Sequence, residues 1–102
     1  MNNIEPFTPY PFGSVTITAG VASAATALPK GGSASRYVVY NAGTVPVMVE
    51  FGSSGVAAVL ATSYPIGPGM KETLRAEGSP THIATISGSA SQTVYVTAGT
   101  GM

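Results

Sequence analysis

The 102-residue chain contains no cysteine, no aspartate and no tryptophan, and it has only one histidine. Without cysteine it can form no disulfide, no thiolate metal ligand and no cysteine nucleophile. Without aspartate a Ser-His-Asp triad cannot be assembled, and one histidine with four glutamates is a poor supply of metal ligands. The composition therefore predicts a protein that is not an enzyme and has no catalytic, cofactor or metal site.

Charge is also scarce. Only 8% of the residues are charged, against roughly 25% in an average soluble protein, and the formal net charge is zero. Such a surface is weakly hydrated, so either partners cover much of it or Ser, Thr and Gly keep a monomer in solution. We favour the first interpretation, which predicts a homo-oligomer, with a trimer as the expected form. Four basic residues and no net positive charge give no electrostatic basis for binding nucleic acid.

Long apolar runs are missing as well. No stretch approaches the roughly 20 apolar residues of a membrane span. The first 13 residues have neither the positive region nor the apolar region of a signal peptide. We therefore expect a protein that is made in the cytoplasm of its cell and has no membrane partner.

What the sequence does have is an alternation of apolar and polar residues with a period of two. Alternating or β-branched runs occur at regular intervals and are separated by Gly, Pro, Asn and Ser; the clearest are residues 14–18, 36–41, 45–51, 81–87 and 92–97. No amphipathic helix is evident, and the Ala-rich residues 19–28 favour a strand or irregular structure. The spacing predicts seven or eight short strands in an antiparallel β-sandwich or β-barrel, jelly-roll-like, with under about 10% helix.

The turns between these runs predict how the strands connect. Residues 41–44 and 88–91 have the turn chemistry of hairpins, and residues 65–69 form a rigid turn with two prolines. Alternation then predicts a mostly buried core, although Val38 and Val39 cannot both point inward. Its expected members are Val15, Ile17, Val38, Val47, Val49, Phe51, Ile83, Ile86, Val94 and Val96.

Residues 1–13 differ from residues 14–102, which form the predicted β domain. Three prolines alternate there with three aromatic residues, Phe7, Tyr10 and Phe12. Proline fixes φ and favours extended geometry in the residue before it, so the segment is predicted to be an extended N-terminal arm. The aromatic residues of such an arm need an external surface, which is either the body of the same protein or a neighbouring subunit. We expect them to anchor the arm on a neighbouring subunit.

Other candidate functional residues have simpler interpretations. His82 opens a predicted strand and is expected to be a surface or edge histidine. The glutamates show no cue for a catalytic pair. Four tyrosines could stack on sugar rings in a carbohydrate-binding β-sandwich module, which is an alternative function: Tyr37, Tyr40, Tyr64 and Tyr95.

Three segments carry a resemblance to a known family. RYVVYNAGTVPVMVEFG, SYPIGPGMKETLRA and THIATISGSASQTVYVTAGTG together cover roughly residues 36–101. Their turn and strand motifs resemble those of small β-rich structural proteins of tailed bacteriophages. The resemblance implies a virion protein, and we expect a capsid decoration (cement) protein that binds the major capsid protein or another virion protein and stabilises the head shell. A head-fibre, neck or tail structural protein is the alternative within that family.

Overall fold

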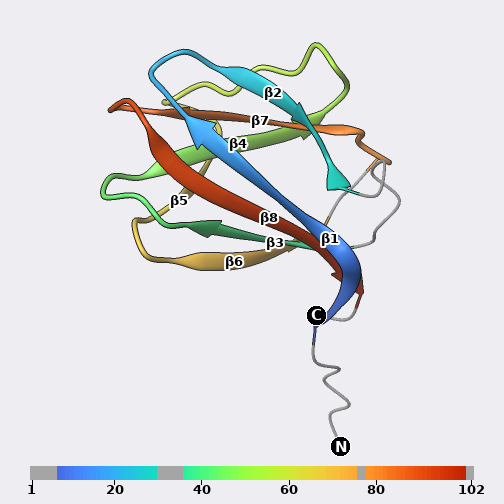
Figure 1. The fold of residues 1–102 in the computed structure, drawn as a ribbon. Helices are drawn as coiled ribbons and strands as arrows, with labels where there is room; N and C mark the ends of the chain where they lie inside the picture. The colour runs from blue at the N-terminus through green and yellow to red at the C-terminus, as the bar shows by residue number, and fades with distance from the viewer. Residues whose placement is uncertain (1–6, 30–35, 76–77, 101–102) are drawn as a thin grey trace, which may run out of the picture.

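The chain folds into two four-stranded antiparallel sheets packed face to face (Figure 1). The computed structural model describes residues 7–29, 36–75 and 78–100. Its strands in chain order are β1 (Thr8–Ala19), β2 (Ala24–Ala27), β3 (Arg36–Asn41), β4 (Val47–Gly52), β5 (Tyr64–Ile66), β6 (Lys71–Arg75), β7 (His82–Ser87) and β8 (Gln92–Thr100). No α-helix occurs in these ranges. The predicted all-β sandwich is confirmed.

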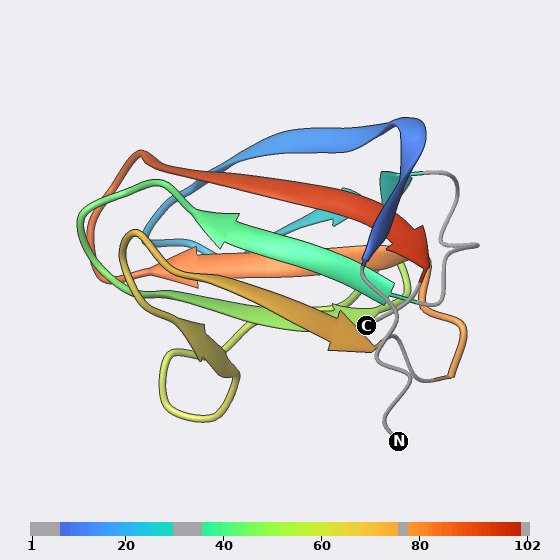
Figure 2. The same cartoon turned by 90° about the horizontal axis from the view of Figure 1, so that it is seen from below.

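The strand order is that of a jelly roll. The first sheet has the order β1-β8-β3-β6 and the second has the order β2-β7-β4-β5. Figure 2 shows the four strands of the first sheet side by side in front of the second sheet. Except for β4 and β5, consecutive strands lie in opposite sheets, so the chain crosses the sandwich repeatedly.

Both predicted hairpins are wrong. Strand β3 pairs with β6 and β8, whereas β4 pairs with β5 and β7. Likewise β7 and β8 lie in opposite sheets. Turn residues reverse the chain, but they do not specify whether it returns in the same sheet or in the facing one. The facing sheet is only about 10 Å away, a distance that the five residues 42–46 can span.

A buried asparagine stabilises the turn between β3 and β4, where the chain crosses from one sheet to the other. Asn41, at the end of β3, is fully buried. Its Nδ2 donates hydrogen bonds to the carbonyl oxygens of Val45 (2.8 Å) and Ile66 (2.9 Å), and its Oδ1 accepts one from the N–H of Gly43 (2.8 Å). The side chain therefore ties the turn after β3 to β5 in the opposite sheet.

A buried glutamine joins the turn between β7 and β8 to the turn between β3 and β4. Gln92 begins β8, and its Oε1 accepts hydrogen bonds from the N–H groups of Thr44 (2.7 Å) and Val45 (3.3 Å). Its Nε2 donates to the carbonyl of Ala90 (3.0 Å). A Cβ on Gly43 would collide with this amide, so glycine is required there for close approach. The two amides together satisfy the backbone of both turns inside the sandwich.

The inward faces of both sheets form one apolar core. Six of the ten predicted core residues are buried: Ile17, Val47, Val49, Ile83, Val94 and Val96. Val15 and Phe51 are half-buried and pack against this cluster. The structure adds core residues that we did not predict, including Tyr37, Val39, Leu28, Ile66 and Ala98.

The inward prediction was wrong for Val38 and Ile86, which are only half-buried. In β3 the inward residues are Tyr37, Val39 and Asn41, so alternation turns Val38 outward. In β7 Ile83 points inward, and a residue three positions later must lie on the opposite face. The predicted rigid turn at residues 65–69 overlaps a short strand, because Pro65 and Ile66 are the last two residues of β5.

Candidate assembly surface

The residues that could support catalysis are dispersed. His82 lies at the start of β7, half-buried, with its Nδ1 2.9 Å from the hydroxyl of Thr81. Glu50 accepts a hydrogen bond from Ser63 (2.8 Å), and Glu72 accepts one from the hydroxyl of Tyr64 (3.4 Å). Within residues 7–29, 36–75 and 78–100, no three His, Cys, Asp or Glu residues are grouped so that they could hold a metal ion. The same ranges contain no helix long and apolar enough to cross a membrane.

The sheet edges differ sharply from one another. An edge strand exposes unpaired N–H and C=O groups, and natural proteins protect such edges with charge, proline or short length. The edge strand β6 carries Lys71, Glu72 and Arg75, and β5 has three residues, one of them Pro65. On the other side of the sandwich, the four-residue β2 consists only of Ala and Thr. Strand β2 and residues 14–19 of β1, which form the edges on that side, therefore lack the charge and proline that protect β5 and β6.

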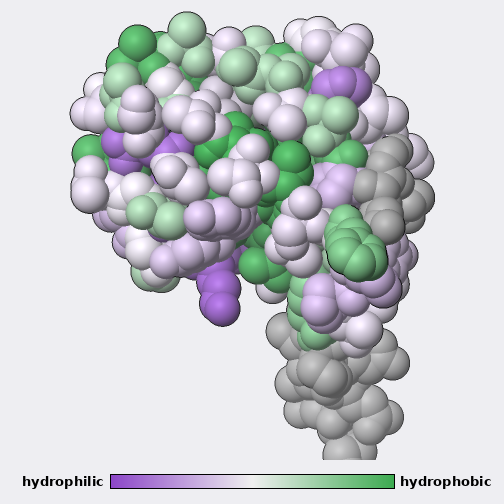
Figure 3. Space-filling view, viewed as in Figure 1, coloured by the Kyte–Doolittle hydropathy of each residue, from purple (hydrophilic) through white to green (hydrophobic). Residues whose placement is uncertain are grey.

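The longest unprotected edge is residues 14–19 of β1, which contain neither charge nor proline. Ile17 and Ala19 are buried, whereas Ser14, Thr16 and Thr18 are exposed. Among the strands of the structure, β1 pairs only with β8, so its other side has backbone groups that no described strand pairs with. Hydrophobic side chains gather in the middle of the face seen in Figure 3, and strongly hydrophilic residues are few around them.

The predicted arm is partly described by the structure, from Phe7 onward. Its boundary at residue 13 falls inside β1, and Thr8 and Pro9 pair with Thr100 and Gly99 of β8. The register then shifts between Pro9 and Ser14, so that residues 10–13 form a bulge. This part of the segment therefore lies along the edge of the body, and residues 1–6 are outside the described ranges.

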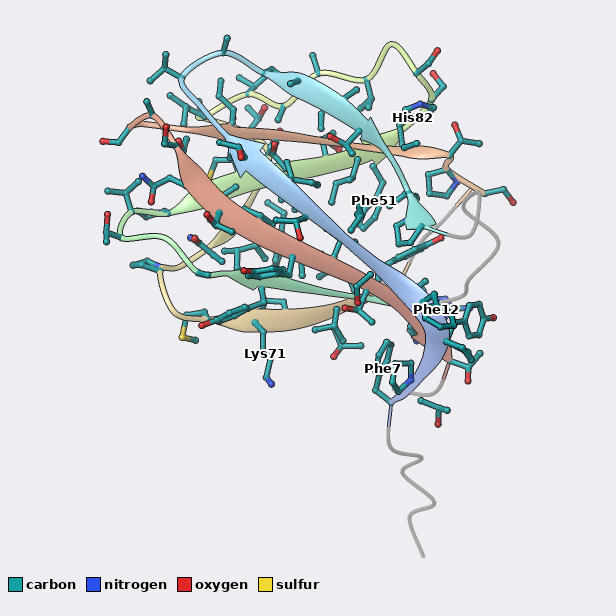
Figure 4. The ribbon with its side chains drawn as sticks, in the orientation of Figure 1. Phe7, Phe12, Phe51, Lys71 and His82 are labelled. Carbon is teal, nitrogen blue, oxygen red and sulfur yellow. The ribbon has the colours of Figure 1, made fainter. Side chains whose placement is uncertain are left out.

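The three predicted anchors have different environments. The ring of Phe7 lies so close to Gly99 that a Cβ there would collide with it. Tyr10 is half-buried and packs against the core. Phe12 is completely exposed, with an exposed fraction of 101%, and its φ is +54°. Figure 4 shows Phe12 on the bend of β1 and Phe7 near the start of that strand. That these residues anchor the chain on a neighbouring subunit stays a prediction.

A glycine makes the bulge possible. Gly13 is buried, and a Cβ there would lie 2.9 Å from the carbonyl oxygen of Tyr10 and 3.0 Å from its Cβ. The segment can therefore turn back on itself only because residue 13 has no side chain. The Pro-Phe-Gly sequence at residues 11–13 was the available signal for an interruption of the strand.

The four tyrosines do not form one platform. Tyr37 is fully buried, and its ring centroid lies 5.8 Å from that of Phe51. Tyr64 lies in the second sheet. Only Tyr40 and Tyr95 are neighbours, paired across β3 and β8 on the outer face of the first sheet with centroids 6.1 Å apart and rings 16° from parallel. The rings thus pack against each other on the outer face.

Beside this tyrosine pair the outer face is hollowed. The hollow has a volume of about 520 Å³ and is lined by Phe7, Pro9, Val38, Lys71, Thr73 and Thr97. These residues come from both edge strands and both central strands of the first sheet, except for Phe7, which precedes β1. Lys71 is the one charged residue in the lining. The start of β1 and the opposite edge strand β6 therefore border one shared surface feature.

Comparison with known proteins gives a structural similarity. Neither a protein-family model nor a curated protein matches the chain. The fold is similar to a chain in a solved structure described as "Bacillus endospore appendages form a novel family of disulfide-linked pili". The similarity has a TM-score of 0.53 at 16% identity and covers 97% of this chain and 95% of that one. At this identity it shows a shared fold.

This finding corrects the functional prediction. The interpretation as a bacteriophage capsid decoration protein, with its phage and carbohydrate-binding alternatives, is wrong, because the fold is matched along nearly its whole length by a bacterial pilus chain. The motifs behind the phage resemblance include residues 41–44 and 88–91, the turns that cross between the sheets. Such turns belong to the jelly-roll architecture and are not specific to one family. The predicted capsid partner, trimeric state and virion location are not tested by the similarity.

Proposed function

We propose that this chain is a non-enzymatic structural subunit that joins further copies of itself into a filament of the pilus type. The observation that carries the proposal is the uncharged, proline-free edge of β1 at residues 14–19. Fold similarity to a chain of endospore pili over 97% of the residues supports it. The partner is a second copy of this chain.

The edge offers directional bonding to such a partner. In an antiparallel strand alternate residues direct both backbone groups to the same side, so six residues have about six outward N–H and C=O groups in total. A strand added along them forms main-chain hydrogen bonds, and the exposed Ser14, Thr16 and Thr18 impose no charge repulsion. Subunits with zero formal net charge also approach without mutual repulsion.

These 102 residues cannot form a disulfide between subunits, so we propose a non-covalent linkage. The similar solved structure is described as disulfide-linked, whereas these 102 residues contain no cysteine. Stability of the filament then comes from many repeated weak contacts, each of which adds to the effective affinity of the next. We expect denaturant to dissociate the filament and reducing agent to leave it intact.

The decisive experiment adds charge to the edge. The purified chain is examined over a range of concentrations by light scattering and negative-stain electron microscopy, and filaments are expected for the unaltered protein. In the double variant Thr16→Lys and Thr18→Lys, two lysines on the exposed face of β1 protect the edge, and assembly should stop. Circular dichroism should show an unchanged strand content, since both positions are exposed.

The matched control has the same added charge in another place. Ser53→Lys with Ser54→Lys puts two lysines in the exposed turn after β4, and this variant should assemble like the unaltered chain. If the unaltered chain remains monomeric at high concentration, the proposed function is wrong. If both double variants assemble equally well, the edge of β1 is not the contact.

A further inference from the structure

Phe12 combines two unfavourable features in one residue. Its side chain has no polar atom and is completely exposed, whereas the other exposed aromatic residues are tyrosines that keep at least half of their surface covered. Its φ of +54° lies in the left-handed region that bulky residues avoid. Among the described residues, no other part of the chain covers its ring. Strain and apolar exposure at one residue suggest a contact that the isolated chain does not make.

The hollow on the first sheet has the chemistry to bind such a side chain. Phe7, Pro9 and Val38 give it apolar walls, and Thr73 and Thr97 are also in the lining. Lys71 is the charged residue of the lining, and an ammonium group can bind the face of an aromatic ring by a cation–π interaction. The lining contains no carboxylate and no second cation, so it does not match a charged ligand.

We propose that Phe12 of one copy inserts into the hollow of the next copy in the assembly. This inference rests on the proposed function, which it deepens by naming a side-chain contact. Phe12 is not among the residues that line the hollow, so one copy can insert its Phe12 into a neighbour while its own hollow receives another Phe12. When a copy inserts Phe12 into one neighbour and receives it from another, the interface is heterologous and extends into a chain of subunits unless its rotation closes a ring.

The area involved agrees with a repeated contact between copies. A phenylalanine buries about 150–250 Å², whereas a stable two-protein interface buries about 1,200–2,000 Å². The insertion alone would not hold two molecules together, but it lies on the same strand as the open edge of residues 14–19. Together the two contacts join one copy to the next, and burial of the ring contributes roughly 10- to 100-fold to the association constant.

The absence of tryptophan from the chain makes a direct test possible. In the variant Phe12→Trp the new residue is the single tryptophan, and its emission reports whether position 12 is in water. On assembly the emission should move to shorter wavelength as the concentration rises. Val21→Trp is the matched control, because Val21 is 64% exposed in the turn after β1 and should keep a solvent-exposed emission.

A second variant blocks the hollow that would receive Phe12. Thr73→Arg fills the hollow from an exposed position on β6, and Ser54→Arg adds the same side chain in a distant exposed turn. Thr73→Arg should raise the concentration needed for assembly by about 10- to 100-fold, and combined with Phe12→Trp it should abolish the spectral shift. Ser54→Arg should do neither.

The outcomes separate the two proposals. If filaments form and the tryptophan at position 12 stays exposed, or the shift persists in Thr73→Arg, the insertion is wrong and the proposed function stands. If no assembly occurs at any concentration, both fail. A spectral shift that is independent of concentration would place the side chain on its own molecule and would also overturn the inference.

Discussion

Replacing Asn41 by alanine should destabilise the fold more than any single exposed substitution. The change removes three hydrogen bonds, two donated by Nδ2 to the carbonyls of Val45 and Ile66 and one accepted from Gly43. Each such bond contributes about 0.5–1.5 kcal/mol net, so their loss costs about 1.5–4.5 kcal/mol, with a central value near 3 kcal/mol. Because total stability is about 5–15 kcal/mol for a typical domain, this is a large fraction of it.

Urea unfolding followed by circular dichroism measures the effect. With a slope of about 1–3 kcal/mol per molar urea for a small protein, a loss near 3 kcal/mol lowers the midpoint by about 1–3 M. Ser54→Ala, in an exposed turn, should leave the midpoint unchanged. A loss below about 0.5 kcal/mol for Asn41→Ala would refute the idea that this side chain holds the crossing.

The variant Asn41→Asp tests the same geometry through its pH dependence. A carboxylate at this fully buried position would face two carbonyl oxygens, so we expect the pKa of the new carboxyl to be raised above its unfolded value of about 3.9. The folded state then binds the proton more tightly than the unfolded state. The variant should therefore gain stability as pH falls through the raised folded pKa, relative to Asn41→Ala. Equal pH profiles for the two variants would contradict the placement of the carbonyls.

Three further predictions concern packing and use the same unfolding assay. Gly43→Ala should cost about 1–3 kcal/mol because its Cβ would displace the Gln92 amide, whereas Gly55→Ala, with open space around it, should change stability by under about 0.5 kcal/mol; equal effects would exclude the close approach. Thr85→Val should be neutral or stabilise by about 1 kcal/mol, since the buried Oγ1 has no hydrogen-bond partner among the described residues, and a clear loss would reveal a missed partner. Val39→Ala should cost about 2 kcal/mol, and a negligible loss would mean that β3 faces the other way.

The alternation of apolar and polar residues predicted the buried side chains well in strands where only one face is apolar. In residues 45–51, the valines and Phe51 alternate with Pro46, Met48 and Glu50, and the structure buries Val47 and Val49 and half-buries Phe51. In β3 the run Tyr-Val-Val-Tyr is apolar on both faces, so periodicity could not decide between Val38 and Val39. The decision came from Asn41, whose amide must point inward to satisfy the turn, and alternation then places Val39 inward as well.

The candidate surface was less accessible to sequence reasoning. The arm was predicted from its prolines and aromatic residues, but its pairing with β8 depends on residues more than 80 positions away. The hollow joins Phe7 and Pro9 to side chains from three other strands. No local pattern encodes which edge remains uncovered, because that follows from the order of all strands in the sheet.

The sequence by itself determined that this protein is built of β-strands, roughly where most strands lie, and that it contains neither cysteine nor aspartate. These properties follow from local periodicity and composition. Only the tertiary structure decided that the two turns cross the sandwich, that Tyr37 is buried while Phe12 is exposed, and that β1 is an open edge. Strand partners are chosen by non-local packing and by the burial of Asn41 and Gln92, and the same turn residues are compatible with either return path until those side chains find their backbone partners.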